Sequence, residues 1–208
     1  MSMKLQRKLE NFVHHVDDPI CMLELGLEYE ELGQYASAIG YYHLCAERTD
    51  SDILAYECLI RMALCYYEQG GREAHEENSL LLAVAHCPHR CEAYYHLSLC
   101  AERKANRTNE DWIQSYAWAV IGYHNAWHQD KRHDSPQRAR VLRTDVQYPG
   151  KHLLKFQKGV ALWWLGRFDE CRNIFLEMKD ELFSYSPHYK QLIENNIINT
   201  KQKERPRR

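Results

Sequence analysis

The 208-residue chain is 45% hydrophobic and 27% charged, proportions typical of a folded, water-soluble protein and unlike those of a disordered or collagen-like chain. Lys and Arg total 27 against 29 Asp and Glu, a net charge of -2, so the chain lacks an overall basic field that would draw it to nucleic acid or anionic lipid. We therefore expect no nucleic acid and no membrane among its partners.

Residues 1–16 alternate charged and apolar side chains and lack the continuous apolar run of a signal peptide. The longest apolar runs, 80–85 and 159–166, have the length of a helix core and not of a membrane span. These features predict a cytoplasmic protein. We then expect its eight cysteines to be reduced thiols, buried on the apolar faces of helices.

Apolar residues at helical spacing predict a capping helix at each end of the chain, in residues 5–16 and 189–197. Between them, the segments that begin at Pro19 and His152 repeat one pattern, and segments 56–90 and 91–127 repeat it with changes. We expect small residues to let two helices approach closely while aromatic rings fill the space between helix pairs. The two matching copies share a small residue, a turn glycine and a ring at equal offsets: Gly26, Gly33 and Tyr42, then Gly159, Gly166 and Phe175.

These offsets resemble the tetratricopeptide repeat (TPR), and the match spans roughly residues 19–178. The resemblance implies an all-α fold, a right-handed α-solenoid of about four helical hairpins with N- and C-terminal capping helices. It places a single TPR-like domain over residues 1–200, with repeats near 19–52, 56–90, 91–127 and 152–185, an irregular insertion at 128–151 and a basic disordered tail at 201–208. Lys155 departs from the pattern: it stands where the family has a buried Trp, and we do not expect it to be buried.

In the tetratricopeptide family, the first helix of each repeat lines a concave groove. At the equivalent positions this chain has aliphatic and aromatic side chains with acidic edges, which suits a protein segment with apolar anchors and some Lys or Arg. Glu57 occupies one of these positions. The predicted partner-binding groove consists of Leu23, Leu27, Glu30, Glu31, Ile60, Leu64, Tyr67, Glu68, Tyr95, Leu99, Glu102, Phe156, Trp163 and Trp164.

The same comparison argues against one kind of partner site. Leu23, Leu27 and Leu64 stand where chaperone-binding members carry the polar residues that hold a C-terminal carboxylate, so we expect no such clamp. For the aromatic groove residues an alternative stays open: they pack against the chain's own insertion or a capping helix, because large apolar residues on helices are usually core. That alternative applies to Tyr67, Tyr95, Phe156, Trp163 and Trp164.

We expect no metal and no cofactor. The densest cluster of possible zinc ligands lacks the paired Cys-x-x-Cys spacing of a structural zinc site, and Pro88 places it at a turn between helices. Small residues at a helix junction explain its cysteines better. The cluster consists of His86, Cys87, His89, Cys91 and His96.

We also expect no catalytic residues, because the sequence contains no Gly-rich phosphate loop, no nucleophile elbow and no His-Glu-x-x-His. Asp50-Ser51-Asp52 has the form that nucleotide-sugar enzymes use to hold a divalent cation. It lies at a repeat boundary, however, without the alternating strands and helices of a nucleotide-binding domain. We interpret it as helix-cap chemistry.

A second resemblance is to the helical-repeat region that follows the catalytic domain in some family 2 glycosyltransferases, without that catalytic domain. It implies a non-catalytic interaction module or, alternatively, an accessory or stand-alone repeat domain of a glycosyltransferase system. The first function predicts an unidentified protein or peptide partner, and the second a separately encoded glycosyltransferase. The motifs that carry the resemblance are Tyr56-Glu57-Cys58, Ala63-Leu64-Cys65-Tyr66, Pro88-His89-Arg90-Cys91-Glu92-Ala93-Tyr94, Thr144-Asp145-Val146-Gln147-Tyr148 and Trp163-Trp164-Leu165-Gly166-Arg167-Phe168.

Overall fold

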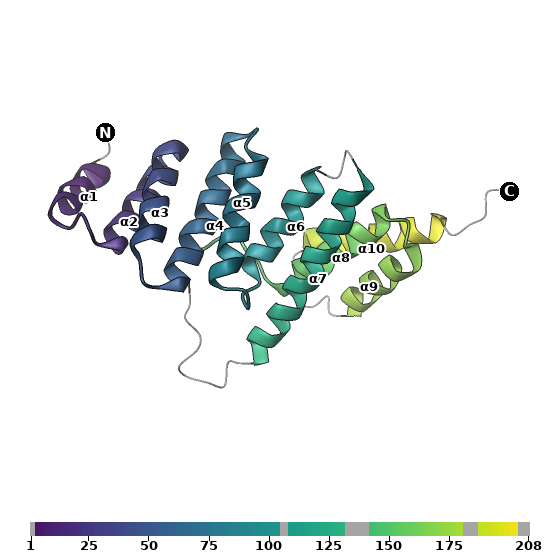
Figure 1. Ribbon diagram of the computed structural model, residues 1–208. Helices are drawn as coiled ribbons and strands as arrows, with labels where there is room; N and C mark the ends of the chain where they lie inside the picture. Colours follow the sequence, from purple (N-terminus) through teal and green to yellow (C-terminus); the bar gives the residue numbers. More distant parts are fainter. Residues whose placement is uncertain (1–2, 105–107, 132–141, 181–186, 204–208) are drawn as a thin grey trace. The chain divides into compact units, whose positions relative to one another are not determined.

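A computed structural model describes residues 3–104, 108–131, 142–180 and 187–203 (Figure 1), and the regular structure in these ranges is helical throughout. The expected all-α class is confirmed for them. Most of the predicted tail and part of the insertion, at 204–208 and 132–141, lie outside the described residues. The helices are α1 (Met3–His14), α2 (Pro19–Glu31), α3 (Tyr35–Arg48), α4 (Asp52–Gln69), α5 (Glu73–His86), α6 (Glu92–Lys104), α7 (Asn109–Lys131), α8 (Lys151–Trp164), α9 (Phe168–Asp180) and α10 (Pro187–Lys203).

The chain divides into two compact units. Unit 1 comprises Met1–Ala93 with Lys131–Gln147, and unit 2 comprises Tyr94–Asp130 with Tyr148–Arg208. In unit 1, consecutive helices pack against each other from α1 to α5, and in unit 2 the same holds from α8 to α10. Among the described helices, none has the length and apolarity required to cross a bilayer.

Side-chain caps set where two helices of unit 1, α2 and α4, begin. The Asp18 carboxylate accepts the backbone N–H of Ile20 at 2.8 Å, which caps α2 ahead of Pro19. Ser51 caps α4 by accepting the N–H of Leu54 at 3.4 Å, and Asp52 lies in the first turn of that helix. Cap chemistry therefore accounts for Asp50-Ser51-Asp52, as the sequence predicts.

The core of unit 1 is built around a close crossing of α2 and α3. A Cβ atom added at Gly26 would lie 2.4 Å from Cε1 of Tyr42, so only glycine fits against this ring. Helix α4 lies between α3 and α5 (Figure 1). It is buried on every side from Leu54 to Cys65, which is the pattern of a helix covered by other parts of the chain all around.

Unit 2 repeats the crossing in α8 and α9. A Cβ atom added at Gly159 would lie 2.7 Å from Cζ of Phe175. Helix α10 packs on α9, and it contributes two of the apolar residues whose spacing predicts a helix at this end of the chain. The buried cluster consists of Leu162, Cys171, Ile174, Phe175, Met178, Ile193 and Ile197.

The expectation that Lys155 stays out of the core is wrong. Its side chain is only 9% exposed, and its ammonium lies 3.4 Å from the exposed Glu177 carboxylate. The aliphatic stem of a lysine can be buried in helix packing while its charged end reaches a carboxylate at the surface. Lys155 therefore occupies the position of a buried anchor, and the exposed carboxylate of Glu177 compensates its charge.

Candidate functional site

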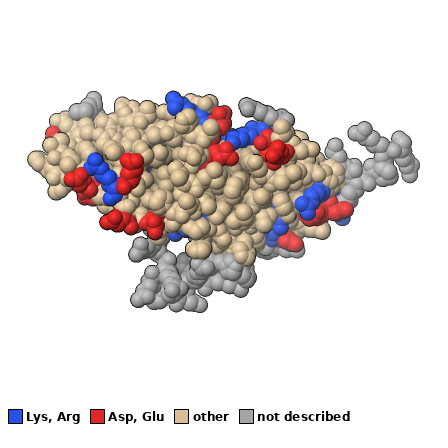
Figure 2. Space-filling model, viewed as in Figure 1, with Lys and Arg blue, Asp and Glu red and all other residues tan. Residues whose placement is uncertain are grey.

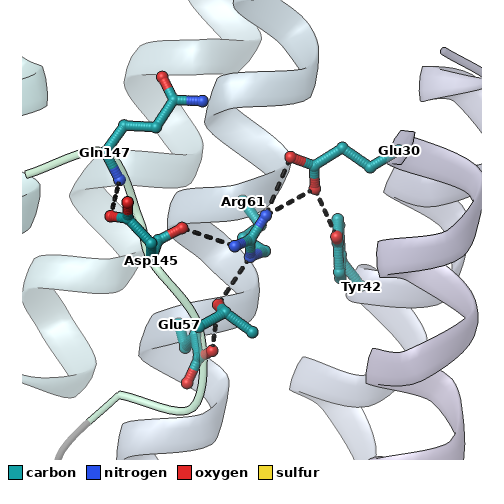
Figure 3. Close-up of polar contacts among 7 residues, drawn as sticks. Glu30, Tyr42, Glu57, Arg61, Asp145 and Gln147 are labelled. Atoms are coloured by element: carbon teal, nitrogen blue, oxygen red, sulfur yellow. Dashed lines mark hydrogen bonds and ion pairs between the residues drawn. The ribbon is translucent and has the colours of Figure 1, made fainter. Parts of the chain in front are cut away.

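Arg61, in the middle of the buried helix α4, is the centre of a network of polar contacts in unit 1. Its Nη1 donates to both carboxylate oxygens of Glu30, at 2.9 and 3.0 Å (Figure 3). The Arg61 side chain is 10% exposed and that of Glu30 19%. A guanidinium removed from water to this extent needs hydrogen-bond partners for its other donors as well.

Those partners come from residues 142–147, a non-helical segment that we call the strap. Nε of Arg61 donates to the hydroxyl of Thr144 at 2.8 Å, and Nη2 donates to the backbone carbonyl of Asp145 at 2.6 Å. One turn earlier on α4, the fully buried Glu57 accepts the backbone N–H of Arg143 at 2.8 Å and the hydroxyl of Thr144. Two side chains of one helix thus bind three successive residues of the strap, Arg143, Thr144 and Asp145; Figure 3 shows the contact between Arg61 and Asp145.

The strap has a defined turn of its own. The Asp145 carboxylate accepts the backbone N–H of Gln147 at 2.8 Å, which is an Asx-turn. Gln147 has a φ of 56°, in the left-handed region that side chains other than glycine rarely adopt. Val146, between them, is 3% exposed. The strap is therefore held by its own turn and one buried side chain as well as by α4.

The network continues from Arg61 into the α2–α3 crossing. The Tyr42 hydroxyl donates to Glu30 at 2.5 Å, and burial together with the Glu30 carboxylate raises the pKa of Tyr42 well above its usual range. Burial alone would lower the pKa of Arg61, but the neighbouring Glu30 and Tyr42 raise it. Tyr42 therefore stays protonated as a donor and Arg61 stays charged.

Of the predicted groove residues in unit 1, the apolar ones are mostly core. Leu23, Ile60 and Leu64 are between 0% and 8% exposed, and Leu27 is half-buried. The acidic residue Glu31 pairs with Lys4 at 2.5 Å, whereas Tyr67 is 49% exposed and Glu68 is also exposed. Among the predicted groove residues of this unit, Glu31 on α2 and the end near Tyr67 and Glu68 on α4 are exposed to solvent.

In unit 2 the aromatic groove residues meet other parts of the chain, as the alternative allows. Tyr95 is buried with its ring 5.5 Å from that of Tyr148, a residue of the predicted insertion. Phe156 contacts Phe175 and also Tyr189 of α10.

The remaining predicted residues of unit 2 differ in exposure. Trp163 contacts Phe168, while Trp164 is 57% exposed and stacks on Trp112 at 5.3 Å. Leu99 and Glu102 are half-buried. Burial raises the pKa of Glu102, against the effect of a hydrogen bond from Gln157. Trp164 is thus the groove residue of this unit that is most open to a partner.

The predicted groove contains Glu30, and Glu57 occupies a predicted groove position, but sequence reasoning missed Arg61 and Thr144 as functional residues. A signal for Arg61 was present: it is the single charged residue in the run Leu59–Cys65 and lies four residues after Glu57, the spacing of a side-chain pair on one helix face. Thr144 belongs to a motif that carries the second resemblance, but that motif does not reveal its contacts with α4, which lie more than eighty positions away along the chain.

The cluster of possible zinc ligands is dispersed in the structure. His86 lies 3.2 Å from the carboxylate of Asp52. Cys91 is buried just before α6, and His96 is buried within that helix. Within the described ranges, no three His, Cys, Asp or Glu side chains are grouped so that they could hold a metal ion.

Figure 2 shows charged side chains in small groups of mixed sign on the face in view, without a broad patch of either charge among the described residues.

Comparison with protein-family models finds no match for this chain, and comparison with curated proteins finds no relative.

Proposed function

We propose that this chain is a non-catalytic protein–protein interaction module, a TPR-like right-handed stack of helical hairpins that binds a segment of a partner protein. The observation that carries the proposal is the strap: α4 holds a non-helical segment through a backbone N–H, a backbone carbonyl and one hydroxyl. A helix face that binds one peptide segment in this way has the chemistry to recognise another.

The paired crossings support the repeat architecture. Gly26 against Tyr42 and Gly159 against Phe175 reproduce one packing arrangement at positions 133 residues apart in both cases (159 minus 26 and 175 minus 42). Repetition of a single structural unit along the chain is the principle of repeat proteins.

We place the module in the cytoplasm. Each of the eight cysteines is a free thiol, and seven of them are buried. Proteins of oxidising compartments commonly use so many cysteines to form disulfides, so free thiols favour a reducing environment.

The partner surface is tested by affinity capture from a lysate of the source with the full-length chain and two single variants, Tyr67→Ala and Trp164→Ala. Both side chains are about half exposed, so we expect both variants to fold, with a loss of about 1–2 kcal/mol for Trp164→Ala, which removes the stacking on Trp112. Val13→Ala, at a residue 69% exposed on α1, is the matched control. We expect at least one variant to lose a partner that wild type and Val13→Ala retain.

Two results would contradict the proposal. One is a partner that binds wild type and both aromatic variants equally. The other is turnover of a nucleotide sugar by the purified chain with a divalent cation, abolished by Asp52→Ala, because a non-catalytic module has no such activity. A captured glycosyltransferase would instead identify the partner as part of a glycosylation system.

A further inference from the structure

The contacts between α4 and the strap use groups that many protein segments carry. Glu57 accepts one backbone N–H, Arg61 donates to one backbone carbonyl, and both bind one hydroxyl. The hydroxyl belongs to Thr144, and the next residue, Asp145, closes an Asx-turn. The site therefore fits a segment in which a Ser or Thr is followed by an Asp or Asn that begins a turn.

The charges around the site favour a basic residue next to that hydroxyl. Glu57 and Glu30 contribute two carboxylates against the guanidinium of Arg61. The strap itself carries Arg143 immediately before Thr144. Its side chain is exposed, so its charge can act on this acidic surrounding without the cost of burial.

Removing the strap would leave Glu57 without its two strap donors, and Arg61 with only the Glu30 carboxylate of its three described acceptor groups. Buried polar groups in that position must be rehydrated or must bind another segment with the same donors and acceptors. The site is thus matched to the strap's chemistry more than to its particular sequence.

We propose that the strap is a pseudo-ligand of this chain, and that the Glu57–Arg61 pair is the recognition site for a partner segment with a Ser or Thr that is preceded by a basic residue and followed by Asp or Asn. This inference rests on the proposed function. Partner and strap compete for the same site, so the partner's apparent affinity is reduced by the fraction of molecules in which the strap is bound.

The test uses a fluorescent peptide with the sequence of residues 140–150 as the probe, titrated into the full-length chain. In wild type the strap occupies the site, and binding is weak. Thr144→Val in the chain removes the hydroxyl that contacts both Glu57 and Arg61, and we expect it to tighten peptide binding about 10- to 100-fold, the loss of one or two charge-assisted hydrogen bonds from the competing strap.

Three controls keep the result specific. The double variant Thr144→Val/Glu57→Gln should return binding to the weak level of wild type. A peptide with Val in place of its threonine should bind the Thr144→Val chain about 10-fold or more weakly than the original peptide. Thr108→Val, an exposed threonine at the start of α7 in unit 2, should leave peptide binding as in wild type.

Hydrogen exchange of the wild-type chain provides a second measurement that needs no substitution. The N–H of Arg143, which Glu57 accepts, should lose protection when the peptide is added in excess. Equal peptide binding by wild type and Thr144→Val, unchanged protection of Arg143, or unfolding of Thr144→Val as judged by circular dichroism would each overturn the inference, because each means that the strap is not exchangeable.

The failure of this inference is distinguishable from the failure of the proposed function. A partner captured through Tyr67 or Trp164, together with a peptide that does not compete with the strap, would leave the interaction module in place and make the strap a permanent part of unit 1. A peptide that competes as expected, together with a partner that binds both aromatic variants as well as wild type, would contradict the proposed partner surface and leave only the exchange of the strap at Glu57 and Arg61 supported.

Discussion

The α2–α3 crossing of unit 1 and the α8–α9 crossing of unit 2 share one kind of packing, and their rings differ only by a hydroxyl oxygen. Each places a glycine of the first helix against an aromatic ring of the second, with distances of 2.4 and 2.7 Å from an added Cβ to the nearest ring atom. In unit 1 the ring is Tyr42, and in unit 2 it is Phe175. The presence or absence of a hydroxyl decides what lies beyond the ring.

The two rings also approach their glycines differently. Tyr42 passes Gly26 with its edge, nearest through Cε1 and Cδ1, which leaves the hydroxyl free to reach Glu30 and through it Arg61. Phe175 points its tip at Gly159, nearest through Cζ, and lies in an apolar cluster that α10 completes. One packing rule therefore supports a polar binding site in one unit and a closed apolar core in the other.

Removing either ring should have the largest effect. Tyr42→Ala and Phe175→Ala each delete a buried aromatic side chain, and we expect each to lower the free energy of unfolding by about 3–5 kcal/mol. Urea unfolding followed by circular dichroism measures the change. Leu176→Ala, an exposed apolar residue on the same helix as Phe175, should cost far less. Equal losses for Phe175 and Leu176 would mean that the crossing is not a centre of stability.

Filling the crossings should have the next largest effect. Gly26→Ala and Gly159→Ala place a methyl group against a ring, and we expect a loss of about 1–3 kcal/mol from overpacking, despite the gain of about 1 kcal/mol that alanine normally brings to a helix. Gly40, in α3, is the matched control because a Cβ there meets no described atom within 4 Å. Gly40→Ala should stabilise the chain, and a stabilising Gly26→Ala would refute the close crossing.

Exchanging the hydroxyl between the two rings should have a smaller effect and tests the difference directly. Tyr42→Phe removes one donor from Glu30 and should cost about 1 kcal/mol. Phe175→Tyr directs a hydroxyl toward Gly159 in apolar surroundings and should cost about 1–3 kcal/mol. The same unfolding measurements apply. A neutral Phe175→Tyr would show that unit 2 can accept a polar ring as unit 1 does.

The smallest effect concerns Glu102, a half-buried acid of unit 2. Burial raises the pKa of Glu102 above its usual value, so the folded chain holds a proton that the unfolded chain releases at lower pH. This contribution makes stability fall as pH rises from about 4.5 through the raised pKa. Glu102→Gln should flatten that part of the profile of unfolding free energy against pH. An unchanged slope would mean that Glu102 is solvated in the folded state.

The parts of the fold that could be predicted from the sequence are those with local or periodic signals. Equal offsets predicted a close helix approach at Gly26 and Gly159, and both positions have one. The rings were expected between helix pairs, whereas Tyr42 and Phe175 pack against the glycine of their own pair. The caps at Asp18 and Ser51 follow from residue type and position. Such features depend on neighbours two to sixteen positions away, which a sequence displays directly.

The strap could not be predicted because hydrogen bonds between a helix and a distant irregular segment leave no period in the sequence. Positions transferred from a repeat family identify a helix face, but they carry no information about which other segment covers it, as Glu57 illustrates. The burial of Lys155 could not be predicted for another reason. Residue type alone marks lysine as exposed, although its aliphatic stem and its ammonium lie in different surroundings.

The buried cysteine thiols can report how often each unit opens locally, through the rate at which they are alkylated. Burial raises the pKa of Cys65 in unit 1 and of Cys171 in unit 2 to about 12 each, so a neutral alkylating reagent should modify them only after the surrounding helices separate. Mass spectrometry of alkylated peptides can then time the breathing of each unit in the unaltered chain. A partner that binds to one unit should slow the alkylation of the cysteine in that unit, which would identify the unit that it contacts.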